Sequence, residues 1–282
     1  MDNLYYIKRK LSNTIFTIIL VLAFVVTLTP FILIFKYIFQ KGAYALDLNF
    51  FIEMARPVGE SGGGMKHAIL GTIYIVLMGA LMSIPTSLIC GIFLSEFPKN
   101  KLARLLKFSV EMMLGIPSIV IGIFSYLILV VPMKSFSAIA GAISLSLIMI
   151  PIMIKTSEEI LKLVPNHLRE AGLALGLPRY KVIINIILRG EFTNLITGII
   201  LAVGRASGET APLLFTAFGN QYINYNLSSP MATLPVQIYT YAISPFEDWQ
   251  RLAWAGAFVL MLIILSMNLL ARLLTKRKEF RK

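Results

Sequence analysis

Six stretches of the chain are apolar enough and long enough to cross a membrane as helices. Five carry no charge, and they are residues 14–35, 68–95, 112–133, 135–154 and 252–271. A sixth, residues 192–218, is interrupted by Arg205 and Glu209. Because a helix needs about 20 residues to cross roughly 30 Å of hydrocarbon, the pattern predicts an all-α integral membrane protein with six transmembrane helices.

Two details of the pattern bear on how these stretches are counted. The third and fourth are separated by little more than Lys134, which follows Pro132 closely, so we expect a helical hairpin with a tight turn. The first stretch follows a basic cluster at residues 8–10, as the apolar part of a secretory signal peptide does. It is too long for a cleaved signal, and no small-x-small site follows it. We therefore expect a retained first span.

The charges agree with a membrane protein and give its orientation. The chain is 57% hydrophobic and 14% charged, against about 25% charged residues in soluble domains. With the N-terminus inside, 19 of the 26 lysines and arginines lie on the cytoplasmic side and six on the other. The positive-inside rule then predicts both termini in the cytoplasm. The net charge of +12 is explained by this topology and by contact with anionic lipid, and does not require nucleic acid.

Outside the spans, two connections are long enough to matter. The cytoplasmic connection 155–191 carries a possible docking segment. The outer connection 219–251 is rich in Tyr, Asn, Pro and Ser, and we expect a short re-entrant or interfacial helix near residues 235–243. The chain then divides into an N-terminal arm with the first span and outer loop, a five-helix core, and a basic tail, at 1–61, 62–275 and 276–282.

Enzyme signatures are weak or absent in the sequence. There is no Walker A motif and no H-E-x-x-H, and His67 and His167 fall on opposite membrane faces. Residues 59–63 match G-x-S-x-G, but a nucleophile elbow needs a strand before it and a helix after it, so we interpret this stretch as a flexible Gly-rich loop. The single cysteine, Cys90, excludes an internal disulfide framework.

The cytoplasmic connection contains one short amphipathic helix. Pro165 suits its start, Gly176 its end and Pro178 a stop. Apolar and small residues recur at helical spacing between them. An isolated helix of about ten residues is marginal in water, and no other part of this cytoplasmic face is expected to cover it, so we expect it to dock into another protein. The residues of its apolar face are Leu168, Ala171, Gly172 and Leu175.

The same helix resembles the E-A-A-x-x-x-G loop of bacterial ABC-importer permeases. It carries Glu170, Ala171, Gly172 and Gly176 at the motif positions. The resemblance implies that these residues form a coupling helix seated in a groove of a cytoplasmic ATPase. Two positions depart from the pattern, since Gly172 replaces the second Ala and Arg189 stands where Pro is usual.

Further stretches are similar to the PstA-type permeases of phosphate ABC transporters. The resemblance implies an ABC-importer permease architecture in the bacterial inner membrane. It also implies three partners: a second permease (PstC-like), an ATPase dimer (PstB-like) that holds the ATP and Mg²⁺, and an outer phosphate-binding protein (PstS-like). No cofactor is implied on this chain. The matching stretches are G-G-G at 62–64, G-I-P-S at 115–118, R-x-x-G-E-T-A-P at 205–212, L-P-V-Q-I-Y at 234–239 and W-A-G-A at 254–257.

The charged pair in the fifth span suggests a transport path independently of that resemblance. A charge at the bilayer centre costs about 2.5–3.5 kcal/mol on insertion scales, so Arg205 and Glu209 should face protein or water. Their i, i+4 spacing would let them partly neutralise each other, and a purely structural ion pair is the alternative. Gly208 and Pro212 weaken the same turns, and broken helices at membrane depth normally line a cavity.

A second break is expected at Gly115 and Pro117, and we expect both breaks to lie near the path. The leading hypothesis is a non-enzymatic half-pore of an ATP-driven phosphate importer. A permease for sulfate or molybdate and, less favoured, a secondary transporter remain as alternatives. A membrane-embedded enzyme would need His, Asp or Glu clustered within the spans, where the sequence offers only Glu209 and, at an edge, Glu111.

Overall fold

The computed structural model describes residues 2–57, 60 and 62–279, and every regular element in them is helical. Gly59 and Ser61 of the Gly-rich loop, and residues 280–282 of the basic tail, lie outside the described residues. Five helices are apolar and long enough to span a membrane, and a bent pair of helices gives a sixth crossing. This confirms the all-α fold with six spans.

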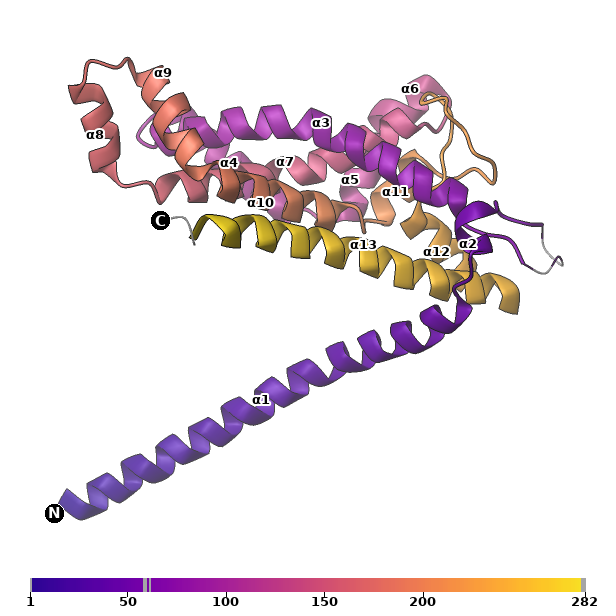
Figure 1. Ribbon diagram of the computed structural model, residues 1–282, viewed down its shortest axis with the longest axis horizontal. Helices are drawn as coiled ribbons and strands as arrows, with labels where there is room; N and C mark the ends of the chain where they lie inside the picture. Colours follow the sequence, from indigo (N-terminus) through magenta and orange to yellow (C-terminus); the bar gives the residue numbers. More distant parts are fainter. Residues whose placement is uncertain (1, 58–59, 61, 280–282) are drawn as a thin grey trace.

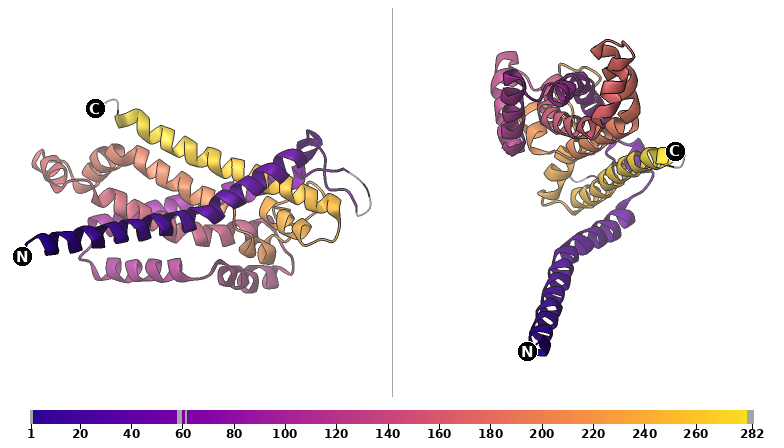
Figure 2. Two further views of the ribbon diagram at one scale, coloured as in Figure 1. Left: turned by 90° about the horizontal axis from the view of Figure 1, so that it is seen from below. Right: turned by 90° about the vertical axis from the view of Figure 1, so that its left-hand side faces the viewer.

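The crossings run back and forth along the long axis of the molecule (Figures 1 and 2). Both termini and the short helix α8, Asn166–Ala174, lie at one end, while α2, Asn49–Ile52, and α12, Leu234–Ala242, lie at the other. This arrangement agrees with cytoplasmic N- and C-termini. Four crossings are each a single helix: α1, Asp2–Ala45, α3, Lys66–Glu96, α7, Ala138–Lys162, and α13, Glu247–Glu279.

The third crossing has a break at the expected place, near Gly115 and Pro117, but it begins earlier than the predicted stretch 112–133. Helix α4, Lys101–Gly115, begins in the segment expected to be cytoplasmic, where the Asn100 side chain accepts from the Leu102 N–H at 2.9 Å. It ends before Pro117, and the chain bends by 103° into a second piece. Pro117 has no N–H and disfavours a helical residue before it, which explains the bend. The second piece comprises α5, Ser118–Ser125, the π-helical turn η1, Tyr126–Val130, and α6, Val131–Met133.

The fifth crossing also differs from the prediction. It is one continuous helix over Arg179–Ala206, so it begins earlier and ends earlier than the predicted 192–218. Arg189 continues the helix at the place where the resemblance leads one to expect a Pro. Beyond the irregular residues 207–210 the chain enters the short α11, Ala211–Thr216. The continuous part comprises α9, Arg179–Val182, the π-helical η2, Ile183–Leu188, and α10, Arg189–Ala206.

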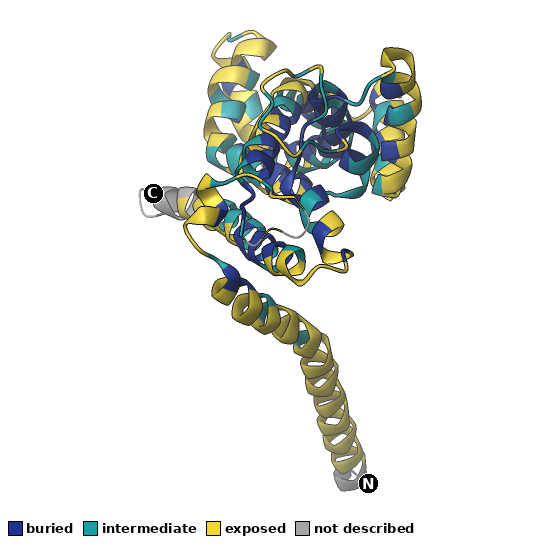
Figure 3. Ribbon diagram, turned by 90° about the vertical axis from the view of Figure 1, so that its right-hand side faces the viewer, coloured by how far each residue is buried: buried dark blue, intermediate teal, exposed yellow. Residues whose placement is uncertain are grey.

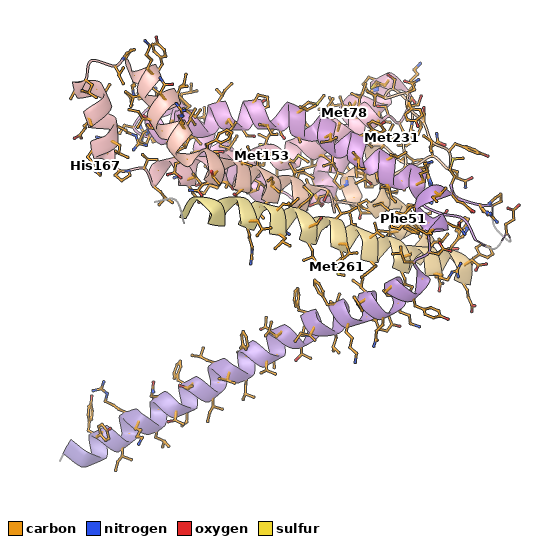
Figure 4. All side chains as sticks on the ribbon, viewed as in Figure 1. Phe51, Met78, Met153, His167, Met231 and Met261 are labelled. Atoms are coloured by element: carbon orange, nitrogen blue, oxygen red, sulfur yellow. The ribbon has the colours of Figure 1, made fainter. Side chains whose placement is uncertain are left out.

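Helices α3 and α7 pack against each other along their length and form the centre of the bundle. Small residues permit the close approach: a Cβ on Gly79 would lie 3.0 Å from the Ala142 carbonyl oxygen, and one on Gly91 would lie 2.6 Å from the Ser157 Cβ. Buried apolar side chains of α3, α7, α10 and α11 fill the core, and Figure 4 labels Met153 among them. This pair is therefore the rigid frame on which the breaks of the third and fifth crossings are placed.

The predicted hairpin and the predicted outer helix are both present. Lys134 turns the chain with φ of +54°, and the Ser137 side chain caps α7 by accepting from the Ala140 N–H at 3.1 Å. The outer connection folds back over the start of α7, where the Leu227 carbonyl accepts from the Ile139 N–H at 3.1 Å. Helix α12 matches the short helix expected near residues 235–243.

Helix α1 stands apart from the rest of the bundle (Figures 1 and 3). Its most apolar window is 0% buried, and its side chains are exposed over most of its length. Contact with α13 is confined to its outer end, where Tyr37 meets Trp254 with ring centroids 5.1 Å apart. A helix with apolar residues all round its surface is what a hydrocarbon environment stabilises.

Candidate functional site

A pocket of about 220 Å³ lies where the break of the third crossing and the end of the fifth crossing meet α7. It brings together the α4–α5 break and the end of α10, which are far apart in the sequence. Pro151, inside α7, forms part of its wall. The lining residues are Met113, Leu114, Ile116, Pro117, Ser118, Ile121, Ile148, Pro151, Ile152, Arg205 and Glu209. Pro151 is not among the residues predicted to lie near the path, although a proline inside an apolar run is a recognisable signal of a disturbed helix.

Arg205 and Glu209 both line this pocket, but they are not a helical ion pair. Helix α10 ends at Ala206, and the Glu209 N–H donates to the Ala206 carbonyl at 3.1 Å. The i, i+4 geometry is therefore absent, and the prediction that they neutralise each other as a helical pair is wrong. Within the described part of the chain, neither side chain has an oppositely charged group within 4.0 Å.

The start of α5 contributes positive polarity to the same pocket. Helix α5 begins at Ser118, directly after Pro117, and both residues line the cavity. The first N–H groups of a helix have no intrahelical acceptor, and the aligned peptide dipoles add a partial positive charge at that end. The pocket thus combines one guanidinium, one carboxylate, the N-terminus of α5 and the C-terminal turn of α4, whose partial negative charge opposes the positive charge of α5, with apolar walls.

The remaining break residues shape the surroundings of the pocket without lining it. Pro212 is buried, and its Cα would lie 2.8 Å from a Cβ on Gly122 of α5. This close approach holds α5 against α11. Gly208 instead lines a separate apolar crevice of about 380 Å³ with Phe35 and Met261, which Figure 4 labels on α13. A Cβ on Gly115 would meet nothing within 4 Å.

Helix α8, at the cytoplasmic end, is the predicted docking segment. Pro165 is its N-cap residue. Its C-terminus is a Schellman motif: the Leu177 N–H donates to the Gly172 carbonyl at 3.3 Å, and the Gly176 N–H donates to the Leu173 carbonyl at 2.9 Å. Gly176 has φ of +76°, a left-handed conformation in which glycine is favoured. The chain's own turn chemistry thus sets where α8 ends.

The exposed surface of α8 differs in one position from the predicted face. Glu170 and Ala171 are exposed, and Leu175 is 81% exposed. Gly172, in contrast, is buried, and a Cβ there would lie 2.8 Å from the Ile186 Cδ1. The prediction that Gly172 belongs to a face without cover is wrong, because that side of α8 packs against the start of the fifth crossing.

The described part of the chain holds no cluster of metal-binding side chains. In the ranges 2–57, 60 and 62–279, no three or more His, Cys, Asp or Glu side chains lie close enough to hold a metal ion. His167 lies on α8 at one end (Figure 4), far along the sequence from His67 at the start of α3. The arrangement instead places a polar pocket between the α4–α5 break, α7 and the end of α10, and it leaves Glu170, Ala171 and Leu175 of α8 exposed.

Comparison with known proteins identifies this combination. The family described as "Binding-protein-dependent transport system inner membrane component" matches residues 83–280. The inward-facing MetNI methionine ABC transporter has a chain of similar fold, with a TM-score of 0.56 and 15% identity, over 74% of this chain and 93% of that one. The fold is therefore that of a multi-pass permease of an ABC importer in the inner membrane.

Sequence relatives define the branch of the family. The phosphate transport system permease protein PstA of Yersinia pestis is 43% identical over 85% of this chain and 81% of its own length. Those of Pasteurella multocida and Haemophilus influenzae are each 39% identical and cover 99% of this chain, with 100% and 99% of their own lengths matched. The chain belongs to the PstA-type permeases, as the resemblance of its motifs indicated.

Proposed function

We propose that this chain forms half of the translocation path of an ATP-driven inorganic phosphate importer, with Arg205 as the residue that contacts the passing anion. The observation that carries the proposal is the pocket in which Arg205, Glu209 and the start of α5 meet. Its PstA relatives are named for phosphate transport, which favours phosphate over sulfate or molybdate.

The chemistry of the pocket suits a tetrahedral oxyanion. The planar guanidinium of Arg205 can donate two parallel hydrogen bonds to two phosphate oxygens. The start of α5, where Ser118 lines the pocket, would add backbone N–H donors, as helix N-termini do in many anion sites. Among the described residues Arg205 has no ion-pair partner within 4.0 Å, so its guanidinium would be available to a ligand.

Glu209 would make the site weak enough to release its ligand. A conduction path must bind well enough to admit an ion and loosely enough to let it leave, and a carboxylate in the same small pocket weakens anion binding. Phosphate near neutral pH carries at least one P–OH group, which can donate a hydrogen bond to a carboxylate oxygen. Sulfate carries no such proton and would meet only repulsion from Glu209.

The cytoplasmic end would couple this path to ATP hydrolysis on another chain. Glu170, Ala171 and Leu175 form an exposed surface on α8, and we assign it to a groove in an ATPase dimer that holds ATP and Mg²⁺. One chain provides only one side of a pore, so the assembly also needs a second, PstC-like permease. An outer PstS-like binding protein would deliver the phosphate.

The test is ATP-dependent phosphate uptake in proteoliposomes that contain the whole transporter. Arg205→Ala should abolish uptake, while membrane insertion and ATPase binding stay normal. Arg205→Lys should also impair uptake, because lysine keeps the charge but loses the planar fork. Near-normal uptake by the Arg205→Ala variant would refute the proposed anion contact.

A further inference from the structure

The cytoplasmic ends of α3, α8 and α9 meet around one buried carboxylate, that of Glu96. Glu96 is the last residue of α3, and its side chain is 4% exposed. Arg169 of α8 donates from Nε to the Glu96 Oε1 at 2.9 Å. Arg179, the first residue of α9, donates from Nη2 to the Glu96 main-chain carbonyl at 2.7 Å. Three helices are thus attached at a single residue.

The Arg169 guanidinium also binds the end of α7. Its Nη1 donates to the Val164 carbonyl at 2.6 Å, and its Nη2 donates to the Leu161 carbonyl at 2.9 Å. These carbonyls lie where α7 ends, where a helix leaves acceptors without intrahelical donors. A lysine cannot make this set of contacts, because only the planar guanidinium presents donors in three fixed directions.

Adjacent residues of α8 differ in their surroundings, since they point about 100° apart around the helix. Glu170 is exposed on the surface assigned to the ATPase, while the Arg169 side chain is 15% exposed and turned into the protein. Gly172 packs against Val182 and Ile186. An isolated helix of this length is marginal in water. The contacts of Arg169 and Gly172 therefore supply the order that α8 lacks by itself.

We propose that Glu96 and Arg169 are positioning residues for energy coupling: they join the docking helix to the α3–α7 frame so that movement imposed on α8 reaches the pocket. This inference rests on the proposed function of α8. Two helical segments connect the Glu96–Arg169 contact to the pocket. One is α7, which carries Pro151, and the other is the continuous helix from Arg179 to Arg205, about 39 Å long at 1.5 Å per residue.

The inference is tested by the number of phosphate ions transported per ATP hydrolysed in the reconstituted whole transporter. Glu96→Ala should lower this ratio about tenfold, because it removes a charge-assisted hydrogen bond and leaves Arg169 without its carboxylate, while ATP hydrolysis continues. Glu159→Ala is the matched control. Glu159 is also cytoplasmic and acidic, but it is 65% exposed and paired with Lys155 of its own helix, so the ratio should change less than about twofold.

A double-mutant cycle separates a positioning role from general destabilisation. If Glu96 acts through Arg169, the double variant Glu96→Ala with Arg169→Ala should transport no less per ATP than Arg169→Ala alone. Independent, multiplying losses would overturn the inference. Should Glu96→Ala fail to insert, Arg169→Lys keeps the charge beside Glu96 but loses donors to α7, and must itself lower the ratio.

The outcome also distinguishes this inference from the proposed function. Ala171→Trp, measured in the same preparation, tests whether α8 docks the ATPase at all. If Ala171→Trp leaves ATPase binding normal, the assignment of α8 fails. If Ala171→Trp blocks binding while Glu96→Ala keeps the full phosphate-to-ATP ratio, only the role of Glu96 and Arg169 is refuted.

Discussion

The central pocket and the docking helix differ in how their polar groups are satisfied. At the end of α8, the Schellman motif supplies N–H donors for the last carbonyls of that helix. The Arg169 guanidinium donates to the carbonyls at the end of α7. In the pocket, Arg205 and Glu209 have no ion-pair partner among the described residues. The groups at the ends of α7 and α8 are therefore paired within the chain, whereas the two charges of the proposed anion pocket are left without such a partner.

The largest expected effect comes from filling the docking surface. Ala171→Trp should abolish ATPase binding and uptake, because a bulky ring on a small exposed position would block the groove. Leu173→Trp is the matched control: Leu173 is also exposed, at 48%, but lies about 200° around the helix from Ala171. Co-purification of the ATPase measures both. Equal retention by the two variants would contradict the assignment of this face.

A smaller effect is expected from the carboxylate of the pocket. Glu209→Gln should slow phosphate release and lower uptake several-fold, while the ATPase stays bound. It should also let sulfate compete with phosphate, because the repulsive charge is removed. Competition uptake with labelled phosphate and excess sulfate measures this. A variant that discriminates as well as the unaltered chain would show that Glu209 takes no part in selectivity.

Features set by neighbouring residues could be predicted from the sequence, whereas features set by contacts between distant segments could not. The end of α8 at Gly176 follows from adjacent residues, as does the break at Pro117, because glycine and proline act on the backbone where they stand. The burial of Gly172 depends on Val182 and Ile186, which the apolar periodicity of α8 cannot show. The pocket joins α4, α7 and α10, so its shape depends on how the helices pack.

The same distinction explains the error over Arg205 and Glu209. Spacing in the sequence becomes spacing in space only while the helix continues, and α10 ends one residue after Arg205. The sequence indicated that Gly208 weakens the helix at this point. The prediction of an i, i+4 pair nevertheless assumed that the helix continues from Arg205 to Glu209. A glycine between two charges is a reason to expect that they are separated.

The packing that forms the pocket can be tested with two glycines of the third crossing. Gly122→Ala places a Cβ 2.8 Å from the Pro212 Cα, and overpacking of this kind costs about 1–3 kcal/mol. Gly115→Ala is the control, since nothing lies within 4 Å of its Cβ. We expect a lower unfolding temperature and reduced uptake only for Gly122→Ala. Identical melting of the two variants would contradict the tight α5–α11 contact.

The smallest expected effect concerns the turn that ends α8. Gly176→Ala puts a Cβ on a residue with φ of +76°. This left-handed conformation costs a residue with a side chain about 1–2 kcal/mol. No steric clash adds to that cost, because nothing lies within 4 Å of the new Cβ. Gly190→Ala has the same open surroundings inside α10 without a positive φ, so it should be neutral or slightly stabilising. Limited proteolysis of the cytoplasmic loop in the purified transporter measures the difference, with faster cleavage expected for Gly176→Ala alone.

Because Arg169 still fixes the first turns of α8, ATPase binding by the Gly176→Ala variant should weaken only a few-fold. A loss as severe as that of Ala171→Trp would mean that the turn itself contacts the ATPase.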